Sequence, residues 1–515
     1  MGLIQTRVYI DFDNDLDFAD ADEDITEYVG EVVIERALGN QLNAGQLQLS
    51  VFDADGRFQP QNTSGPYGEN LTIGRRVRVD MAVIGTGEFV TQFYGFITEI
   101  TPEYVAGEEQ SPIRGIIAHD LLHLLDIRKI TTGTLLNKTT GELVDLLLDN
   151  IGWDYTATFD RIYLDTLTAV LGGPGANWRS IDSGQTEIPY CQWEKTTIAQ
   201  ALREICETEH GNFYISKDCY AVFEDRHYRN AVRDSQATLT DDNISELVLR
   251  YTDEDLFNNV EVIARPRMVG TPGSVVFDAI GDGQGHEIPI GESREYYVTF
   301  SDPDTQRMCE ATDIITPVAP TDYTANSAAD GSGSDRTANI TVSLEQDDND
   351  RYKITVTNDY SKSVYLTKLQ MRGTPLVTLD AVPSVARDEL SIAQYLQRDY
   401  TLDSYLLSSV SEAQDYADWL LYQMSQPWAR VERLTLVDCT WDNALQIVQR
   451  ELSDRVTIQS EKYNVSGDFF IEGITFEAAA GGDVRCEWQL SGIRTDVLFF
   501  TLDIDYLDSE AVLGY

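Results

Sequence analysis

The chain has 515 residues, 42% of them hydrophobic, and a formal net charge of −48 at pH 7. This charge argues against a protein that grips nucleic acid, because phosphate binding depends on lysine and arginine. No apolar run reaches the length of a membrane span, no signal peptide precedes the acidic start, and the six scattered cysteines predict buried thiols rather than a disulfide framework.

Acidic residues are spread over the whole chain, and only eight lysines accompany them. This distribution differs from an acidic tail and resembles the composition of proteins from extreme halophiles. In molar salt the Debye length falls to about 3 Å, so the repulsion between surface carboxylates is screened. The composition therefore predicts a folded protein of about three to four domains that works in concentrated salt.

Residues 1–117 are rich in strand signals and are predicted to form a small β-barrel. Within this region, residues 71–104 have the pattern of strand, turn and strand. Val77, Val79 and Met81 alternate with polar residues, which is typical of a strand with one buried face. The strands are predicted at 32–34, 46–52, 76–83, 90–100 and 112–117.

Residues 451–478 repeat this strand–turn–strand pattern near the C-terminus. Arg76 aligns with Arg455, and Gly95 and Gly473 follow the two arginines at nearly the same distance. Each glycine lies in a run of aromatic and β-branched residues, where glycine usually marks a bulge or a bend. A chance likeness is the alternative, because short strand patterns are degenerate. We predict two related small β-barrels in one chain.

Between residues 118 and 235 the hydrophobic period becomes helical, which predicts a small α/β unit inserted after the first barrel. Thr139 and Glu142 form a capping box that begins one helix, and Thr197 and Gln200 begin a second. Two strands then follow, at 213–215 and 220–224.

The strand pattern resumes at residue 236 and is interrupted by a long insert. Residues 236–266 and 377–494 are predicted to form the second barrel, with a helix at 410–425. Residues 267–376 carry alternating strands with almost no helical signal, and they predict an inserted immunoglobulin-like β-sandwich. The final segment, 495–515, has apolar residues without a core of its own and is predicted to dock onto a neighbouring subunit.

The glycine-rich loop of the insert holds the candidate metal ligands. Asp330 and Asp335 flank it and could hold a structural calcium or magnesium ion, although two carboxylates are few for a full oxygen shell. The alternating aspartates from Asp11 to Asp17 lack the glycine of an EF-hand loop, because Leu16 stands at the sixth position. We expect an exposed acidic edge there, with weak and non-specific cation association. No other cofactor is predicted.

His119 and His123 are predicted to lie four residues apart on one helical face. A zinc peptidase would need glutamate where Asp120 stands and a third ligand elsewhere, so two polar positions on a linker helix are the expected interpretation. No G-x-S-x-G nucleophile motif occurs. We therefore predict no catalytic residue and no enzyme.

Three segments resemble the tail-tip or baseplate hub proteins, also called minor tail proteins, of siphovirus-like phages and archaeal tailed viruses. Residues 46–79 resemble the opening barrel of that family. The loop NSAADGSGSD with the following VYLTKLQMRGTPL resembles its insert, and the run from Leu452 through IEGITFEA to WQLSG is the last match. Together these segments cover most of the chain in order.

The resemblance implies a structural virion protein, made in the host cytoplasm and placed at the distal end of a non-contractile tail. It implies a homotrimer ring in which two barrels per subunit match the six-fold tail tube. The expected partners are the tail tube or distal tail protein, the tape-measure protein, and a tail fibre or receptor-binding protein. The ring would continue the lumen for genome ejection without sequence-specific nucleic acid binding. The acidic composition suggests a halophilic archaeon as host.

Two other functions were compared with this one. A glycan-binding adhesin of a virion or cell surface is the alternative, but the chain shows no signal peptide and no repeated aromatic platform. A glycan hydrolase of a tail tip would be favoured by right-handed β-helical repeats, and the sequence has no such period.

We predict that the protein is folded in molar salt and loses structure or assembly when salt is removed. The carboxylates of a chain with net charge −48 repel one another over about 10 Å at 0.1 M salt. Thermal unfolding in graded salt measures the effect. An equal or higher melting temperature in dilute buffer would contradict the halophilic interpretation.

Overall fold

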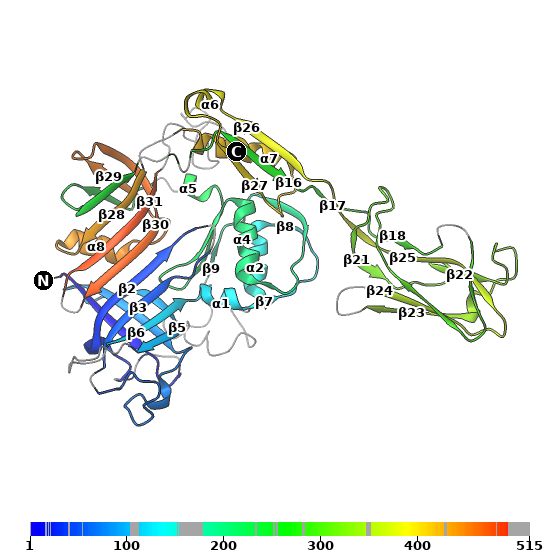
Figure 1. Ribbon diagram of the computed structural model, residues 1–515, viewed down its shortest axis with the longest axis horizontal. Coiled ribbons are helices and arrows are strands. Elements are labelled where there is room, and N and C mark those ends of the chain that lie inside the picture. Colours follow the sequence, from blue (N-terminus) through cyan, green and yellow to red (C-terminus); the bar gives the residue numbers. More distant parts are fainter. Residues whose placement is uncertain are drawn as a thin grey trace.

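The computed structural model describes residues 2–15, 18, 20, 22–39, 42–53, 55–102, 113–151, 153, 179–231, 234–250, 253, 256–280, 284–346, 352–426, 430–479 and 482–492. Strand outweighs helix within these residues, which confirms the mainly β class with α+β parts. Figure 1 shows a β body built from both ends of the chain, an α/β unit beside it and an elongated lobe at the opposite end. The predicted docking segment, 495–515, lies outside the described residues. No helix in the described part is long and apolar enough to cross a membrane.

The first half of the β body has six strands in the order β1-β4-β5-β6-β3-β2. Val77 and Val79 of β4 are buried as predicted, but Arg76 and Asp80 are buried as well. The Arg76 guanidinium is paired with Asp11 at 2.8 Å, so a strand expected to have one buried face is covered on both. The elements are β1 (Ile4–Ile10), η1 (Thr26–Tyr28), β2 (Val29–Ala37), β3 (Gln46–Phe52), η2 (Gly68–Asn70), β4 (Arg76–Val83), β5 (Val90–Pro102) and β6 (Ile113–Asp120).

The second half repeats this arrangement in the order β14-β29-β30-β31-β28-β15. The same succession of hairpins occurs in the same chain order, although β14 pairs with β29 in parallel whereas β1 pairs with β4 antiparallel. Helix α8 (Trp441–Gln449), which the sequence did not predict, packs against β28 and against β4 of the first half. The strands are β14 (Ala237–Thr240), β15 (Glu246–Arg250), β28 (Arg430–Val437), β29 (Arg455–Ser460), β30 (Val465–Ala479) and β31 (Val484–Gly492).

The two halves are joined into one 12-stranded sheet by the antiparallel pairing of β2 with β30, which we call the seam. In the first half, β1 is linked to the segment that precedes β2 through the isolated bridge between Tyr9 and Asp24, and no ladder between described residues joins β1 to β2. Two separate closed barrels are therefore not found among the described strands. The repeated halves share one continuous sheet instead.

The repeat is clearest at the turn that precedes β4 and β29. The N–H of Gly74 donates to the carbonyl of Ile97 at 2.8 Å, and the N–H of Ser453 donates to the carbonyl of Ile471 at 2.8 Å. Gly74 has φ 89° and Ser453 has φ 66°, so both adopt left-handed backbone, the second without glycine. Within the described residues, the hairpins at 71–102 and 451–478 are thus equivalent, as the sequence predicted for 71–104 and 451–478.

The glycine spacing that suggested the repeat is a coincidence. Gly95 lies before Ile97 in β5, whereas Gly473 lies after Ile471 in β30. The register against the next strand shifts at corresponding places, between Ile97 and Glu99 and between Ile471 and Gly473. A β-bulge is therefore conserved between the halves, and only Gly473 adjoins it.

The α/β unit follows β6 and packs around helices α2 and α4. Both predicted helix starts are confirmed, because Thr139 and Glu142 form a capping box and the Thr197 side chain accepts from the N–H of Gln200. The elements are α1 (Leu122–Ile127), β7 (Lys129–Ile130), β8 (Leu135–Thr139), α2 (Thr140–Asn150), β9 (Arg179–Ile181), β10 (Glu187–Cys191), β11 (Thr196–Thr197), α4 (Ile198–Glu209), β12 (Asn212–Ile215), β13 (Ala221–Glu224) and α5 (Tyr228–Ala231).

A three-stranded sheet in the order β26-β16-β27 lies next to this unit. Strand β16 (Asn259–Ala264) was expected in the second barrel, but it pairs with β26 (Val382–Arg387) and β27 (Asp399–Asp403). The predicted helix α7 (Val410–Met424) is capped by Ser409 and packs on this sheet with its own core. Residues 236–266 and 377–494 are thus divided between two sheets. The remaining helix is α6 (Glu389–Tyr395).

The insert forms the elongated lobe (Figure 1). A six-stranded sheet around β25 and a three-stranded sheet in the order β20-β24-β23 share one apolar core. The immunoglobulin-like sandwich and its limits at 267 and 376 stay predictions. The elements are β17 (Arg267–Val269), β18 (Ser274–Asp278), β19 (His286–Ile288), β20 (Ser293–Tyr297), β21 (Glu310–Ile315), β22 (Tyr323–Asn326), η3 (Thr337–Asn339), β23 (Ile340–Gln346), β24 (Tyr352–Asn358) and β25 (Val364–Thr378).

The cysteines are free thiols, as predicted. Cys191, Cys206, Cys219 and Cys486 are buried, but Cys439 is exposed and Cys309 is partly exposed. The prediction that all six are buried is therefore wrong for two of them.

We predict that replacing residues 271–374 with an Asn-Gly turn leaves the rest of the protein folded. The N–H of Gly270 donates to the carbonyl of Pro375 at 2.8 Å, so a two-residue turn can close this hairpin stem. The cut keeps Arg267, which donates to the carbonyls of Tyr190 and Tyr405. Circular dichroism and gel filtration in molar salt measure the outcome. Aggregation of the shortened chain, with an unfolded isolated insert, would contradict it.

Candidate functional site: the polar face of the joined sheet

One face of the joined sheet is polar across the seam, and the other forms the core. On β2, Val32 and Ile34 are buried, whereas Glu31 and Glu35 are exposed. A slip of one residue at the seam would exchange these two sets, so the buried side chains fix the register. We call the exposed side the polar face.

A row of directly opposite residues crosses the polar face from one half to the other. Glu35 is opposite Gln46 on one side and opposite Thr475 on the other. The in-register seam therefore makes two repeated halves into one surface. In order, the row consists of His119 on β6, Gln46 on β3, Glu35 on β2, Thr475 on β30 and Glu487 on β31.

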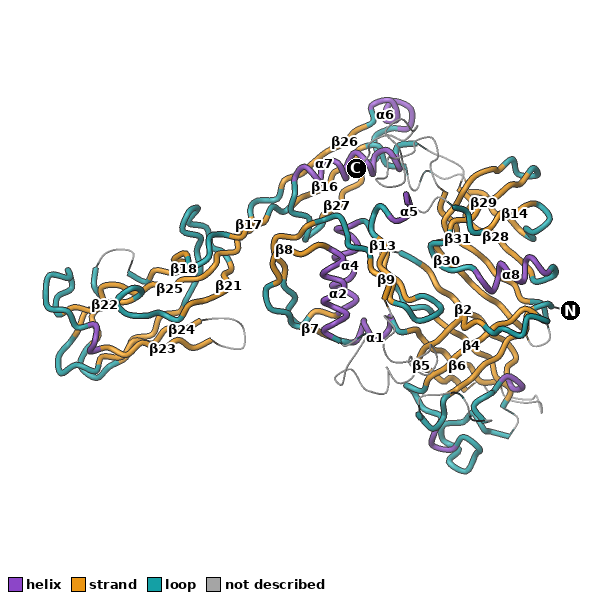
Figure 2. Tube along the Cα trace, turned by 180° about the vertical axis from the view of Figure 1, so that it is seen from behind, coloured by secondary structure: helices purple, strands orange, loops and turns teal. Residues whose placement is uncertain are grey.

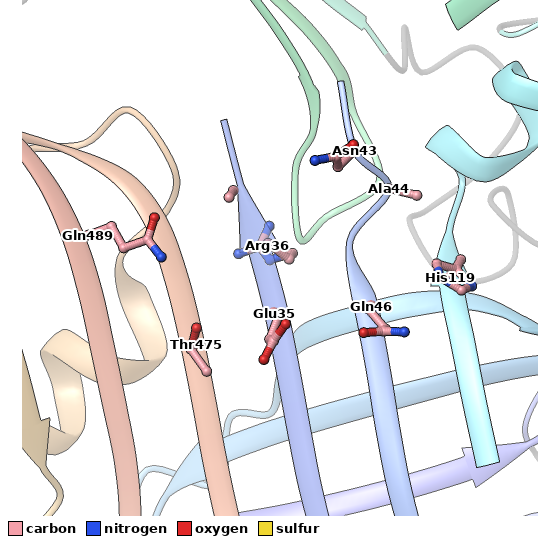
Figure 3. Close-up of a pocket in the computed structure, with 9 residues that line it drawn as sticks. Glu35, Arg36, Asn43, Ala44, Gln46, His119, Thr475 and Gln489 are labelled. Atoms are coloured by element: carbon pink, nitrogen blue, oxygen red, sulfur yellow. The ribbon is translucent and has the colours of Figure 1, made fainter. Parts of the chain in front are cut away.

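A pocket of about 350 Å³ lies on the seam within this face. Figure 3 shows Glu35, Thr475 and Gln489 around it on three neighbouring strands. Beside it, Nδ1 of His119 lies 2.8 Å from the hydroxyl of Thr98. Burial, and then the nearby second histidine, hold the pKa of His119 below its ordinary value. The pocket thus offers amide, hydroxyl and carboxylate groups and a neutral imidazole at neutral pH.

The charge of the polar face is uneven. Near the seam, Glu31, Glu35 and Glu477 are exposed, and none of them forms an ion pair within the described residues. Towards β15 the charges are balanced, because Arg433 and Arg485 each contact both Glu246 and Glu487. The centre of the face therefore repels anions more than its edge does.

A buried lysine holds the α/β unit against the second half. Nζ of Lys217, in the loop between β12 and β13, donates to the carbonyls of Val448, Gln449 and Arg450 at 2.8, 2.8 and 3.0 Å. These carbonyls lie at the C-terminal end of α8, where helix carbonyls lack backbone partners and favour a cation. Burial lowers the pKa of the Lys217 ammonium, and this partner set opposes that effect.

Glu451 connects this lysine to the seam. Its Oε2 accepts from the backbone N–H of Lys217 at 2.9 Å, and its Oε1 lies 2.8 Å from the guanidinium of Arg36. Arg36 is a buried residue of β2 and lines the seam pocket. One carboxylate thus links β2, the α/β unit and the segment after α8.

A second polar joint lies at the bulge of β30. Arg229 donates from two nitrogens to Glu472 at 2.5 and 3.1 Å. The Ser453 hydroxyl donates to the buried carboxylate of Glu224 at 2.6 Å. Burial raises the pKa of Glu224 to about 7. The repeated turn and bulge of the second half are therefore the points that the α/β unit contacts.

The predicted metal ligands Asp330 and Asp335 are exposed, and each accepts hydrogen bonds within its own local turn. Oδ1 of Asp330 accepts from the N–H of Ser332 at 2.9 Å, and Oδ1 of Asp335 accepts from the N–H of Thr337 at 2.8 Å. Neither belongs to a group of three or more potential ligands within the described residues. Binding of calcium or magnesium at this loop stays a prediction.

The histidine interpretation was wrong in its secondary structure. His119 lies in β6, and α1 begins only at Leu122, so His119 and His123 do not share a helical face. Their rings stack with centroids 5.3 Å apart. Sequence reasoning also missed Lys217 and Arg36 as joint residues. A charged side chain in a loop is ordinarily expected to be exposed to solvent. The one sequence signal that marked Lys217 was the rarity of lysine in this chain.

No protein-family model and no curated protein matches the chain. Among solved structures, the 43 kDa tail protein of prophage MuSo2 from Shewanella oneidensis is similar, with a TM-score of 0.50 and 10% identity over 95% of this chain and 98% of that chain. The chain has the fold of that tail protein. A tail protein from Neisseria meningitidis MC58 matches with a TM-score of 0.48 and 12% identity over 95% and 96% of the two chains. Prophage tail protein gp18 from Listeria monocytogenes EGD-e matches with a TM-score of 0.38 and 8% identity over 94% of each.

We predict that Lys217→Met lowers the free energy of unfolding by about 3 kcal/mol, because it leaves the carbonyls at the end of α8 without the ammonium that donates to them. Lys462→Met is the matched control, since Lys462 is exposed and should change stability by less than about 0.5 kcal/mol. Denaturant unfolding in molar salt measures both. Equal stability of the two variants would show that the joint contributes little.

Proposed function

We propose that the chain is a structural tail protein of a tailed virus, the hub of a baseplate ring at the distal end of a non-contractile tail. The observation that carries this proposal is the shared fold over 95% of this chain and 98% of a prophage tail protein. Similarity over nearly the full length of both chains favours a common architecture over a shared single domain.

The internal repeat supports a ring of three copies. Each chain contributes two halves with the same strand succession, the same turn and the same bulge. Three chains then present six related surfaces to a six-fold tail tube, and head-to-tail contacts whose rotation closes give cyclic rings. The tail tube or distal tail protein is the partner proposed on this side.

The charge of the polar face supports its placement along the lumen. Glu31, Glu35 and Glu477 lie near the seam without a described ion pair, and no lysine lies among the residues of the crossing row. A negative surface lowers the affinity for phosphate, so a genome can pass without being held. The acidic composition favours a virus of a halophilic archaeon.

The insert supports a second set of contacts. Figure 2 shows the lobe of β18, β21, β22, β23, β24 and β25 extending away from the β body. A lobe with its own core, attached through the β17–β25 stem, suits the carriage of a tail fibre or receptor-binding protein. The tape-measure protein is the partner proposed inside the ring. In this function the residues of the polar face are structural rather than catalytic.

Sedimentation in molar salt and electron microscopy test the proposal. A trimeric ring with a central channel is expected. Glu35→Cys and Glu287→Cys, both placed at exposed positions in a background of Cys439→Ser and Cys309→Ser, are labelled with maleimide gold. Gold on residue 35 should lie at the channel, and gold on residue 287 of the insert should lie at the periphery. A monomer in molar salt, or gold on residue 35 at the outer rim, would contradict the proposal.

A further inference from the structure

Four carboxylates of the first half converge at the end of β1. One oxygen from each of Asp11, Asp13, Asp15 and Glu23 lies within 4.8 Å of the corresponding oxygens of the other three. Asp13 and Asp15 are exposed, but Asp11 is fully buried and Glu23 is 2% exposed. The sequence predicted an exposed acidic edge at 11–17, so the burial of Asp11 and the approach of Glu23 correct that expectation.

The backbone turn after β1 produces this convergence. Asn14 has φ 66°, and its N–H donates to Oδ1 of Asp11 at 2.6 Å. The N–H of Asp15 donates to Oδ1 of Asp13 at 3.1 Å. In an extended strand, alternating side chains also lie on one side, but the distance between them is longer. The tight left-handed turn brings these side chains close together.

Glu23 is the member of the cluster that its protein surroundings leave unsatisfied. Its Oε2 accepts from the N–H of Asp20 at 3.3 Å. Its Oε1 is buried and has no hydrogen-bond partner among the described residues. Burial of a carboxylate oxygen without a partner is costly.

Within the described residues, Arg76 is the cation in contact with the cluster, with Nη1 2.8 Å from Oδ2 of Asp11 and 3.0 Å from Oδ1 of Asn14. Summed over these five ionisable groups, there is an excess of three negative charges when all are ionised. A divalent cation reduces that excess to one and supplies the buried Glu23 oxygen with a partner.

We propose that Asp11, Asp13, Asp15 and Glu23 bind one Ca²⁺ ion. All four offer hard oxygen ligands, which this ion prefers, and water can complete a shell of six to eight. The number of carboxylates also favours this ion. Mg²⁺ dehydrates reluctantly and is usually held by one or two carboxylates, whereas Ca²⁺ accepts several.

The ion would stabilise the place where the first half is held together. The N–H of Ile10 donates to the carbonyl of Glu23 at 3.0 Å, and the N–H of Ile25 donates to the carbonyl of Val8 at 3.0 Å. Asp11 follows the end of β1 and Glu23 begins the segment that bridges back to it. Calcium therefore links the end of β1 to the segment that begins at Glu23.

Calorimetric titration of CaCl₂ into chelator-treated full-length protein in molar NaCl tests the site. One Ca²⁺ per chain is expected, with Mg²⁺ at least about tenfold weaker. Asp13→Asn combined with Asp15→Asn should lower the Ca²⁺ affinity at least about tenfold, and both positions are exposed, so the variant should fold. Asp415→Asn combined with Asp418→Asn, both at exposed positions of α7, is the matched control and should bind as the wild type does.

Thermal unfolding gives a second readout through Glu23→Gln, which keeps the shape of the side chain and removes its charge. In chelator this variant should melt at or above the wild type, because an unsatisfied buried carboxylate is lost. In calcium the order should reverse, because only the wild type is stabilised by the ion. Wild-type protein without a calcium-dependent melting temperature would overturn the proposal. So would loss of calcium binding on Asp330→Asn combined with Asp335→Asn, the rival site, with unchanged binding in the Asp13/Asp15 variant.

Discussion

The antiparallel seam between β2 and β30 is the constraint on which the rest of the fold depends. It pairs Glu31–Ala37 with Gly473–Ala479, segments separated by most of the chain. Because side chains alternate between faces, a shift of one residue would place Glu35 in the core and Ile34 on the surface. Each chain segment inserted between the two halves must therefore begin and end at positions that preserve this register. The insert meets the requirement through its hairpin stem.

Three cations of this acidic chain lie where its units meet. Arg226 lies 3.0 Å from Glu209 of the α/β unit and 3.0 Å from Glu412 of α7. Lys217 and Arg229 serve the contacts with the second half. Buried ion pairs add little net stability, but removal of one partner is costly. These ion pairs favour contact between the surfaces that carry them. Because carboxylates are in excess, contact between two acidic surfaces is unfavourable.

Local signals were sufficient to predict helices α2 and α4 of the α/β unit. Strand pairing depends on contacts between distant residues, and the sequence pattern did not determine it. The Thr139 and Thr197 caps are contacts within one turn, so sequence spacing contains them. The pairing of β16 with β26 joins segments on either side of the insert, and strand pattern alone does not choose between two possible sheets. Helix α8 is short and lies between two strands, which concealed its period.

The candidate sites show the same limit in chemical terms. The sequence shows which residues can be charged, but it does not show which of them are buried in the folded chain. Lys217 is buried against the end of α8, which is distant in sequence, and Glu23 is buried where the chain turns back onto the end of β1. The acidic run at 11–17 was read correctly as a set of carboxylates and wrongly as fully exposed. Composition predicted an acidic surface, and only the in-register seam shows that one polar face is continuous across both halves.

The two halves share a backbone plan but are supported differently, and this difference bears on assembly. The first half has Arg76 paired with Asp11 beside the acidic cluster. The second has α8, whose end is held by Lys217, and Ser453 in place of Gly74. Equivalent turns and bulges give neighbours similar backbone shapes, while unlike side chains distinguish the halves. A ring of three such chains would therefore be nearly six-fold in its strands and only three-fold in its chemistry, so a six-fold partner and a three-fold partner could each find a matching surface.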